Sequence, residues 1–202
     1  TALPFCLQRS ALKRLSILSS RHDISIYYNC WGADLFSSYD QAPLRIGYIH
    51  NHFPNFDNYI RHFAPYLDGF FTVNPATTET AREILNRTHP PQNIQTIPLP
   101  ISPPNSMPVF SKRDVVGLVG RINYEQKRYD RLPEFAKLLA RNKPDMRIEV
   151  MGEGPKKIEL MQRTSHLENI SYLPWAIGDA YWKTLSNWKY ILFLSDYEGL
   201  PI

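Results

Sequence analysis

The stretch VVGLVG, residues 115–120, decides the fold class of this sequence. Its apolar residues run without a polar break and end at a glycine, which is typical of a parallel strand buried on both faces. Apolar residues then recur at helical spacing between 132 and 139, and a second apolar strand is expected at 147–151. A strand, a helix and a second strand in this order predict parallel strands joined by right-handed crossovers, a Rossmann-like α/β structure.

The same alternation continues on both sides of this unit. Later in the chain we expect a helix from Ile158, a strand at 170–173, a helix at 179–188 and a fully buried strand at 190–194. Earlier in the chain, the expected elements are strands at 24–28, 46–49, 70–73 and 94–97 and helices at 58–66 and 78–85. Thr77 or Thr78 is expected to cap the amino end of the second of these helices.

A proline-rich stretch at residues 98–108 separates the two halves. Proline lacks an amide donor and fixes φ, so the stretch predicts an extended linker, with a surface loop inside one domain as the alternative. We expect the latter part of an N-terminal domain over 1–103, a linker over 104–112, and the first part of a C-terminal domain over 113–202. Both domains are expected to be incomplete, because a doubly wound domain usually needs more than about 100 residues.

Composition excludes several classes of protein. Of the 202 residues, 43% are hydrophobic and 21% are charged, an ordinary globular mix that argues against disorder and fibrous repeats. Two cysteines cannot build a disulfide framework or a four-thiolate zinc site, and a reducing, cytoplasmic environment is expected. The net charge of +4 suits an anionic ligand but is too small to indicate nucleic-acid binding.

Candidate binding residues follow the strand at 115–119. In parallel sheets ligands bind outside the carboxyl ends of the strands. Gly120 and Arg121 stand there, and Lys127 follows six residues later. Glycine lets a ligand approach the backbone, arginine binds phosphate bidentately and lysine adds a point charge. Together they predict a phosphate site, with solvated surface charges as the alternative.

Three other segments carry weaker signals. Gly152-x-Gly154 lacks the third glycine of a dinucleotide fingerprint. SDYEGLP, residues 195–201, places a carboxylate before a helix N-terminus that favours an anion, although an ordinary turn is equally compatible. His50-x-His52 has no third ligand at a regular spacing, so we expect no metal and instead a polar histidine facing a cleft between the halves.

These segments together resemble one known family. VGRI at 119–122 with EQKR at 125–128, VMGEGP at 150–155, YLP at 172–174 and SDYEGLP at 195–201 resemble glycosyltransferase family 4 in order and spacing. The first half resembles the family more loosely. The family comprises retaining enzymes, and the resemblance implies an α/β fold of two Rossmann-like (GT-B) domains facing a cleft.

The resemblance also implies roles for individual residues. Arg121 and Lys127 would hold the donor diphosphate, Glu198 would face the donor sugar, and His50 would reach the same sugar from the N-terminal domain. The family's second glutamate would fall beyond residue 202, and its N-terminal glycine-rich loop has no counterpart here. The remaining positions implied to bind the nucleotide sugar are Gly120, Gly152, Gly154, Leu173, Pro174, Trp175, Gly199 and Leu200.

The implied reaction moves a hexosyl group from a nucleotide-diphosphate sugar to a hydroxyl group, without a metal or another cofactor. A UDP-sugar donor, a glycan or lipid-linked acceptor, and a place in polysaccharide or glycoconjugate synthesis are expected. The location would be the cytoplasm or the inner face of the membrane, where peripheral association is compatible. The alternatives are a sugar-nucleotide epimerase of the same architecture and a non-catalytic nucleotide-sugar-binding fragment. Interleaved acidic residues make a nucleic-acid binder the weakest interpretation.

Overall fold

The chain forms two compact units, and each is described by itself. One comprises Thr1–Pro100 with Glu198–Ile202, and the other comprises Ile101–Tyr197. The computed structural model describes residues 5–28, 33–51, 54–87, 93–106, 108–110 and 113–199.

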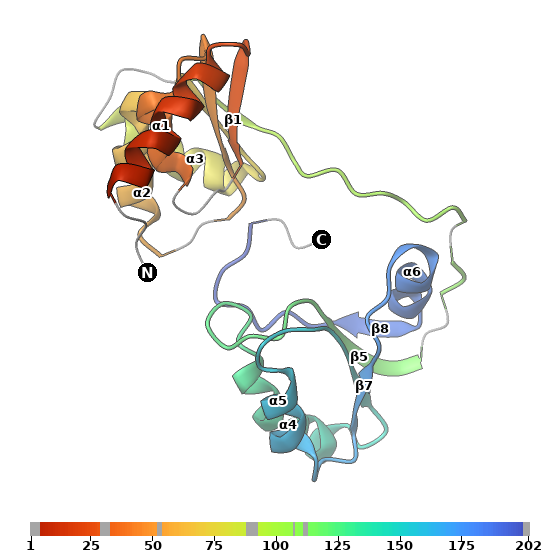
Figure 1. Ribbon diagram of the computed structural model, residues 1–202. Helices are drawn as coiled ribbons and strands as arrows, with labels where there is room; N and C mark the ends of the chain where they lie inside the picture. The colour runs from red at the N-terminus through yellow and green to blue at the C-terminus, as the bar shows by residue number, and fades with distance from the viewer. Residues whose placement is uncertain are drawn as a thin grey trace. The chain divides into compact units, whose positions relative to one another are not determined.

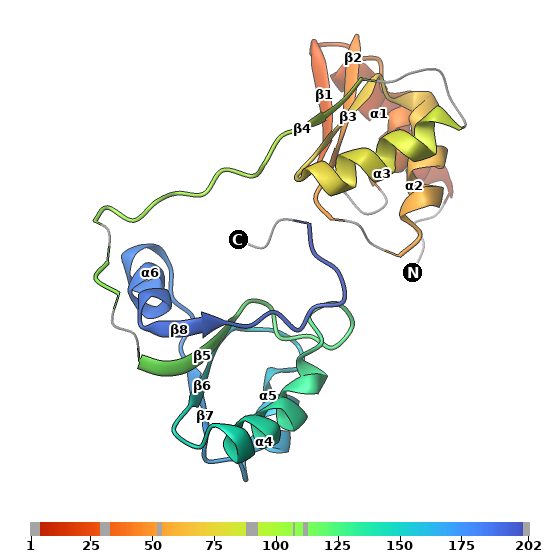
Figure 2. The same cartoon turned by 180° about the vertical axis from the view of Figure 1, so that it is seen from behind.

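The first unit is built on a parallel sheet with the strand order β1-β2-β3-β4. Consecutive neighbours joined by right-handed crossovers place their connecting helices on one face, and Figures 1 and 2 show the three helices together beside one face of this sheet. Its elements are α1 (Phe5–Ser19), β1 (Ile24–Tyr28), η1 (Ala33–Tyr39), β2 (Leu44–Ile49), α2 (Phe56–Phe63), η2 (Ala64–Tyr66), β3 (Gly69–Thr72), α3 (Pro75–Asn86) and β4 (Asn93–Thr96).

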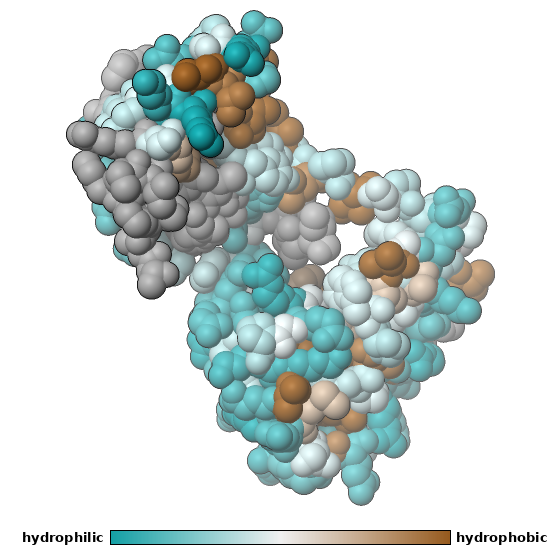
Figure 3. Space-filling model, in the orientation of Figure 1, coloured by the Kyte–Doolittle hydropathy of each residue, from teal (hydrophilic) through white to brown (hydrophobic). Residues whose placement is uncertain are grey.

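The core of this unit lies between the sheet and its helices. In α2, Phe56, Ile60 and Phe63 recur at helical spacing and are all buried. The other face of the sheet is open over β1, where Ile24 and Ile26 are about half exposed and Figure 3 shows apolar side chains at the surface.

The start of α3 corrects the predicted cap. Asn74 is the N-cap, and its Oδ1 accepts a hydrogen bond of 2.8 Å from the amide of Thr77. Thr77 and Thr78 lie inside the helix and are buried. The hydroxyl of Thr78 interacts with those of Thr72 and Thr96 instead, so it joins the helix to the sheet rather than ending it.

The second unit is a parallel sheet with the strand order β7-β6-β5-β8. The strand order reverses at β5, because β6 and β7 follow on one side and β8 pairs on the other. Figures 1 and 2 accordingly show α4 and α5 on one face of the sheet and α6 on the opposite face. The elements are β5 (Arg113–Val119), η3 (Tyr129–Arg131), α4 (Leu132–Asn142), β6 (Arg147–Met151), α5 (Lys157–Thr164), β7 (Ile170–Leu173), α6 (Gly178–Ser186) and β8 (Trp188–Ile191).

The residues around Trp188 correct two predictions. Trp188 was expected in a helix but begins β8, where its indole covers Gly117 and donates 2.7 Å to Glu149 Oε2. The strand expected at 190–194 lies at 188–191, and Tyr190 and Ile191 are 55% and 44% exposed rather than buried. The physical reason is that β8 is an edge strand of the described sheet, paired with β5 alone.

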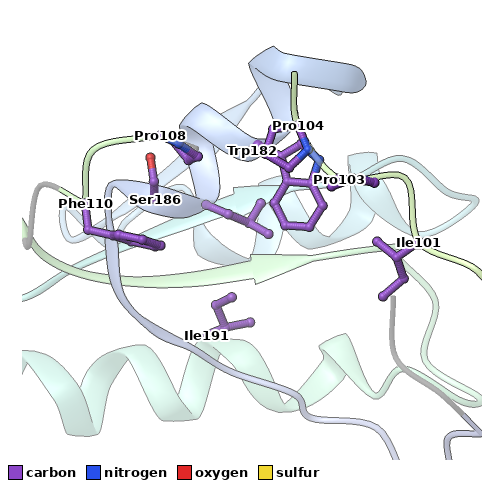
Figure 4. Close-up of a pocket in the computed structure, with 9 residues that line it drawn as sticks. Ile101, Pro103, Pro104, Pro108, Phe110, Trp182, Ser186 and Ile191 are labelled. Atoms are coloured by element: carbon purple, nitrogen blue, oxygen red, sulfur yellow. The ribbon is translucent and has the colours of Figure 1, made fainter. Parts of the chain in front are cut away.

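The proline-rich segment packs on the second unit from Ile101 onward. Its described residues form neither helix nor strand. The amide and the side-chain Nδ2 of Asn105 donate 3.1 and 3.0 Å to the carboxylate of Asp179 in the first turn of α6. Figure 4 shows the apolar cavity of about 440 Å³ that this segment forms with α6 and β8, lined by Ile101, Pro103, Pro104, Pro108, Phe110, Trp182, Leu185, Ser186 and Ile191.

Candidate functional site

The carboxyl ends of β5 and β8 flank the point where the strand order reverses. At such a point the chain leaves two neighbouring strands in opposite directions, which opens a crevice outside the sheet. A hollow of about 10 Å³, roughly the size of one water, lies there. It is lined by Leu118, Val119, Lys127, Tyr129, Leu192, Phe193, Leu194 and Ser195. Lys127, selected from the sequence as a phosphate ligand, is therefore at the crevice.

The backbone at the end of β5 leaves room beside this hollow. Gly120 has a φ of 133°, a conformation that residues with a side chain rarely adopt, and a Cβ built there would meet no atom within 4 Å. Arg121 follows, is exposed, and makes no hydrogen bond or ion pair with the residues that the structure describes. A guanidinium that makes no hydrogen bond or ion pair within the described part of the chain thus follows an unobstructed stretch of backbone.

The loop after β5 brings Lys127 to the hollow. Asn123 Oδ1 accepts 2.8 Å from the amide of Lys127, and the carbonyl oxygen of Asn123 accepts 3.2 Å from the amide of Tyr129. Arg128 has a positive φ of 50° and reverses the chain before η3. The position of Lys127 therefore depends on the turn from Asn123 to Tyr129.

Arg128, the cation next to Lys127 in the sequence, is paired with the carboxylates of Asp130 and Asp196. Its guanidinium donates 3.0 and 2.9 Å to Asp130 and 2.6 Å to Asp196. Hydrogen bonds from Arg128 and Arg131 hold the pKa of Asp196 below its usual range. Asp196 lies in the SDYEGLP segment selected from the sequence, but no role was predicted for its side chain, because its partners lie 65 and 68 positions earlier in the chain.

Gly152 and Gly154 have a packing role in the structure. A Cβ on Gly152 would overlap the carbonyl oxygen of Gly120, and one on Gly154 would overlap that of Ile122. The two strand-end loops approach closely through hydrogen bonds from Gly120 N to Met151 O (3.1 Å) and from Ile122 N to Glu153 O (2.8 Å). These glycines hold the loop that carries Arg121, and their predicted contact with a nucleotide stays a prediction.

The segment after β7 offers an exposed indole at the same edge of the sheet. Leu173 packs in part against the core on the α6 side, whereas Pro174 and Trp175 are exposed, Trp175 by 49%. Because β7 lies two strands from β5, this indole is displaced along the edge from Arg121. The structure therefore provides a flat apolar surface there.

In the first unit, His50 directly follows β2 and lies among aromatic rings. Its ring lies 4.1 Å from that of Tyr28 and 4.9 Å from that of Tyr48, measured between centroids. Its Nε2 and the Oδ1 of Asn51 are buried, and neither has a hydrogen-bond partner among the described residues. Burial lowers the pKa of His50 below its usual value, so the imidazole is neutral near pH 7.

Gly199 packs against the same strand end. It forms an antiparallel bridge with Asn51, and its carbonyl oxygen accepts 2.6 Å from Nδ2 of Asn74. A Cβ on Gly199 would overlap the carbonyl oxygen of His50, so only glycine fits this approach. Glu198 is half-buried and belongs with Gly199 to the first unit, whereas Arg121 and Lys127 belong to the second. Leu200 lies outside the described residues.

Other candidate sites are less suited to an anionic ligand. The described residues that line the cavity beside α6 are apolar apart from Ser186 and include no cation. Within the described ranges no three His, Cys, Asp or Glu side chains gather closely enough to hold a metal ion, and His52 lies outside those ranges. Among the helices that the structure describes, none has the length and apolar character needed to cross a bilayer.

The comparisons with known proteins identify the architecture. The sequence matches no protein-family model and no curated protein. The fold is similar to that of TarM, with a TM-score of 0.74 and 24% identity over 93% of this chain and 40% of TarM. The pneumococcal O-GlcNAc transferase GtfA, in complex with UDP and GlcNAc, gives 0.67 and 15% over 96% of this chain and 41% of GtfA.

A third similar structure is the lipopolysaccharide outer core galactosyltransferase WaaB, with a TM-score of 0.65 and 19% identity. This chain is covered completely and corresponds to 59% of WaaB. The chain thus spans about two-fifths of TarM and GtfA and more than half of WaaB. At these identities the likeness shows the fold alone. The chain has the α/β fold with parallel sheets of the GT-B glycosyltransferases, as predicted.

Proposed function

We propose that this chain is part of a retaining glycosyltransferase that moves a hexosyl group from a nucleotide-diphosphate sugar to a hydroxyl acceptor. The observation that carries the proposal is that Lys127 lines the hollow at the carboxyl ends of β5 and β8. Arg121, two positions after β5, adds an exposed guanidinium that makes no hydrogen bond or ion pair with the described residues. GtfA, which has a similar fold, was solved with UDP and GlcNAc. A UDP-sugar donor and a glycan or lipid-linked acceptor are proposed on this basis.

The proposed chemistry follows from where charge develops. When the anomeric C–O bond breaks, its electron pair goes to the diphosphate oxygen, and positive charge builds on the sugar. Arg121 and Lys127 would stabilise the leaving diphosphate, which would bind outside the hollow because the hollow is too small to contain it. The acceptor oxygen then attacks from the face that the diphosphate leaves and transfers its proton to a diphosphate oxygen. This step retains the anomeric configuration.

The remaining residues take supporting parts in the proposal. Trp175, with Leu173 and Pro174, would line the nucleotide base, because its exposed ring offers a stacking surface. His50 would bind a sugar hydroxyl through Nε2. This role is supported because Nε2 is buried without a hydrogen-bond partner among the described residues and the imidazole is neutral near pH 7. Glu198 would face the sugar. Gly120 would let the phosphate approach the backbone, and the segment of Gly199 and Leu200 would contact the sugar or phosphate.

Replacing Arg121 with alanine in the full-length protein tests this proposal. Removing a preorganised donor to developing charge typically costs about 2.7–4 kcal/mol, so kcat is expected to fall by about 10²–10³. The KM for the donor should change much less, because the interaction strengthens mainly in the transition state. Steady-state kinetics with a nucleotide-sugar donor and a hydroxyl acceptor provide the measurement.

Arg141→Ala is the matched control. Arg141 is an exposed arginine in the last turn of α4 and makes no hydrogen bond or ion pair with the described residues. Normal turnover by Arg121→Ala, or an equal loss in Arg141→Ala, would contradict the proposed role of Arg121. The same assay without acceptor distinguishes transfer from epimerisation, since an epimerase consumes the donor without an acceptor. Donor binding without any turnover would indicate a binding module instead.

A further inference from the structure

Asp196 joins two loops that meet at the β5–β8 crevice. Its Oδ2 accepts 2.6 Å from Nη1 of Arg128, and its Oδ1 accepts 2.6 Å from Nη2 of Arg131. The remaining Nη1 of Arg131 donates 2.9 Å to the carbonyl oxygen of Leu194. One carboxylate and two guanidinium groups therefore connect the turn before α4 with the segment after β8.

Backbone groups reinforce the same connection. The amide of Asp196 donates 3.0 Å to the carbonyl oxygen of Gln126, and Nε2 of Gln126 donates 3.3 Å to the carbonyl oxygen of Tyr197. We call these contacts, together with those of Arg128 and Arg131, the Asp196 bridge. The bridge attaches the chain on both sides of Lys127, at Gln126 and at Arg128. The Asp196 bridge thus positions Lys127 through its two chain neighbours, and none of the hydrogen bonds of the bridge involves Lys127 itself.

The backbone of Arg128 supports a positioning role. Its φ of 50° lies in the left-handed region, which residues other than glycine adopt only when their surroundings hold them there. The carboxylates of Asp130 and Asp196 hold the Arg128 guanidinium from two sides. They also offset its charge, which would otherwise repel a second cation in the same turn.

Exposure limits what these ion pairs add to overall stability. The side chains of Asp196 and Arg131 are 40% and 45% exposed, and exposed ion pairs contribute little to the free energy of unfolding. Their effect is expected to be local: they keep the two loops ordered. A contact that orders a loop next to a ligand site changes binding more than melting temperature.

We propose that Asp196 is a positioning residue that fixes Lys127 at the crevice for a diphosphate ligand. The inference rests on the proposed function, because it takes Lys127 as a diphosphate ligand. Asp196 itself touches no reacting atom in this scheme. It acts through the turn from Gln126 to Arg131.

Asp196→Asn in the full-length protein is the test. Asparagine keeps the size of the side chain but replaces one acceptor oxygen with an amide NH2 group, a donor that would face a guanidinium donor. Two readouts are measured: amide hydrogen exchange of residues 123–131 and 194–197, and calorimetric binding of uridine diphosphate, with inorganic pyrophosphate as a probe that lacks the base. We expect exchange to accelerate and affinity for both probes to fall by about tenfold, the scale of one or two lost hydrogen bonds.

Asp114→Asn is the matched control. Asp114 pairs with Lys189 at 2.7 Å and is similarly exposed, but it joins the opposite, amino ends of β5 and β8. Its removal is expected to leave both readouts unchanged. Asp196→Glu, which restores the carboxylate, should recover part of the affinity.

A double-mutant cycle separates positioning from a general structural effect. If Asp196 acts through Lys127, adding Asp196→Asn to Lys127→Ala should weaken binding no further. Additive losses, normal exchange in Asp196→Asn, or equal effects in Asp114→Asn would each overturn the proposal. If the wild-type protein binds neither probe, the proposed function fails at this site. Amide exchange then still decides whether Asp196 holds the turn.

Discussion

The side-chain amide of Asn74 forms hydrogen bonds with two segments of the first unit, one through its oxygen and one through its nitrogen. Its Oδ1 caps α3 by accepting from Thr77, and its Nδ2 donates to the carbonyl oxygen of Gly199. The cap concerns helix stability, whereas the second bond concerns the segment that carries Glu198. Substitutions that change one end of the amide can therefore distinguish the two effects.

Asn74→Ala removes both bonds and is expected to lower the free energy of unfolding by about 1 kcal/mol, the usual cost of losing an N-cap. Asn74→Asp keeps the cap but places a carboxylate oxygen against the carbonyl of Gly199. Its unfolding free energy should stay close to that of the wild type, while amide exchange at Glu198 and Gly199 accelerates. Urea denaturation and hydrogen exchange measure the two effects. Equal destabilisation by both variants would refute this division of roles.

Single residues show what sequence reasoning could and could not reach. Gly120, Arg121 and Lys127 could be selected because strand ends are visible in the sequence and ligands gather there. The role of Asp196 could not be predicted, because it depends on Arg128 and Arg131, which only the fold brings near. The close approach that requires glycine at Gly199 was equally hidden, since it depends on His50, far away in the chain.

At the scale of elements, two short strands of the second unit were among the elements predicted most accurately. The strands at 147–151 and 170–173 have the predicted bounds. The helix α1 was not predicted, and it has no acidic residue in its first turn and no basic residue in its last turn to mark its ends. The apolar residues near 190 indicated burial, but the edge position of β8 exposes them. The position of a strand in its sheet cannot be predicted from the sequence of that strand alone.

Where β5 pairs with β8, the indole of Trp188 packs over Gly117, which has no side chain. A Cβ on Gly117 would overlap the indole of Trp188, whose Nε1 is held by Glu149. Gly117→Ala is expected to destabilise the second unit by about 1–3 kcal/mol, the usual cost of overpacking a core. Thermal unfolding followed by tryptophan fluorescence is a suitable measurement. An unchanged midpoint would show that Trp188 can move aside without loss.

At the scale of the whole molecule, the chain divides just after Pro100. The segment from Ile101 to Phe110 packs on α6 and β8, and the two hydrogen bonds from Asn105 to Asp179 hold its middle. The prolines predicted an extended segment, but nothing in their sequence indicates which unit the segment packs on.

Asp179→Asn should loosen this segment, because one of its two acceptors becomes a donor facing Asn105. We expect faster amide exchange over 101–110 and earlier proteolytic cleavage there, with little change in melting temperature because Asp179 is exposed. Asp145→Asn, an exposed carboxylate just before β6, is the control. Unchanged exchange in Asp179→Asn would mean that apolar packing alone holds the segment.

The three tryptophans of the second unit differ in their access to solvent. Trp188 is shielded in the core, Trp182 lines the apolar cavity, and Trp175 is open at the edge where the strands end. A dissolved quencher such as iodide can therefore reach Trp175 much more readily than Trp188. The molecule thus carries an intrinsic optical reporter beside its own candidate site, and its emission can follow occupancy of that edge without any attached label.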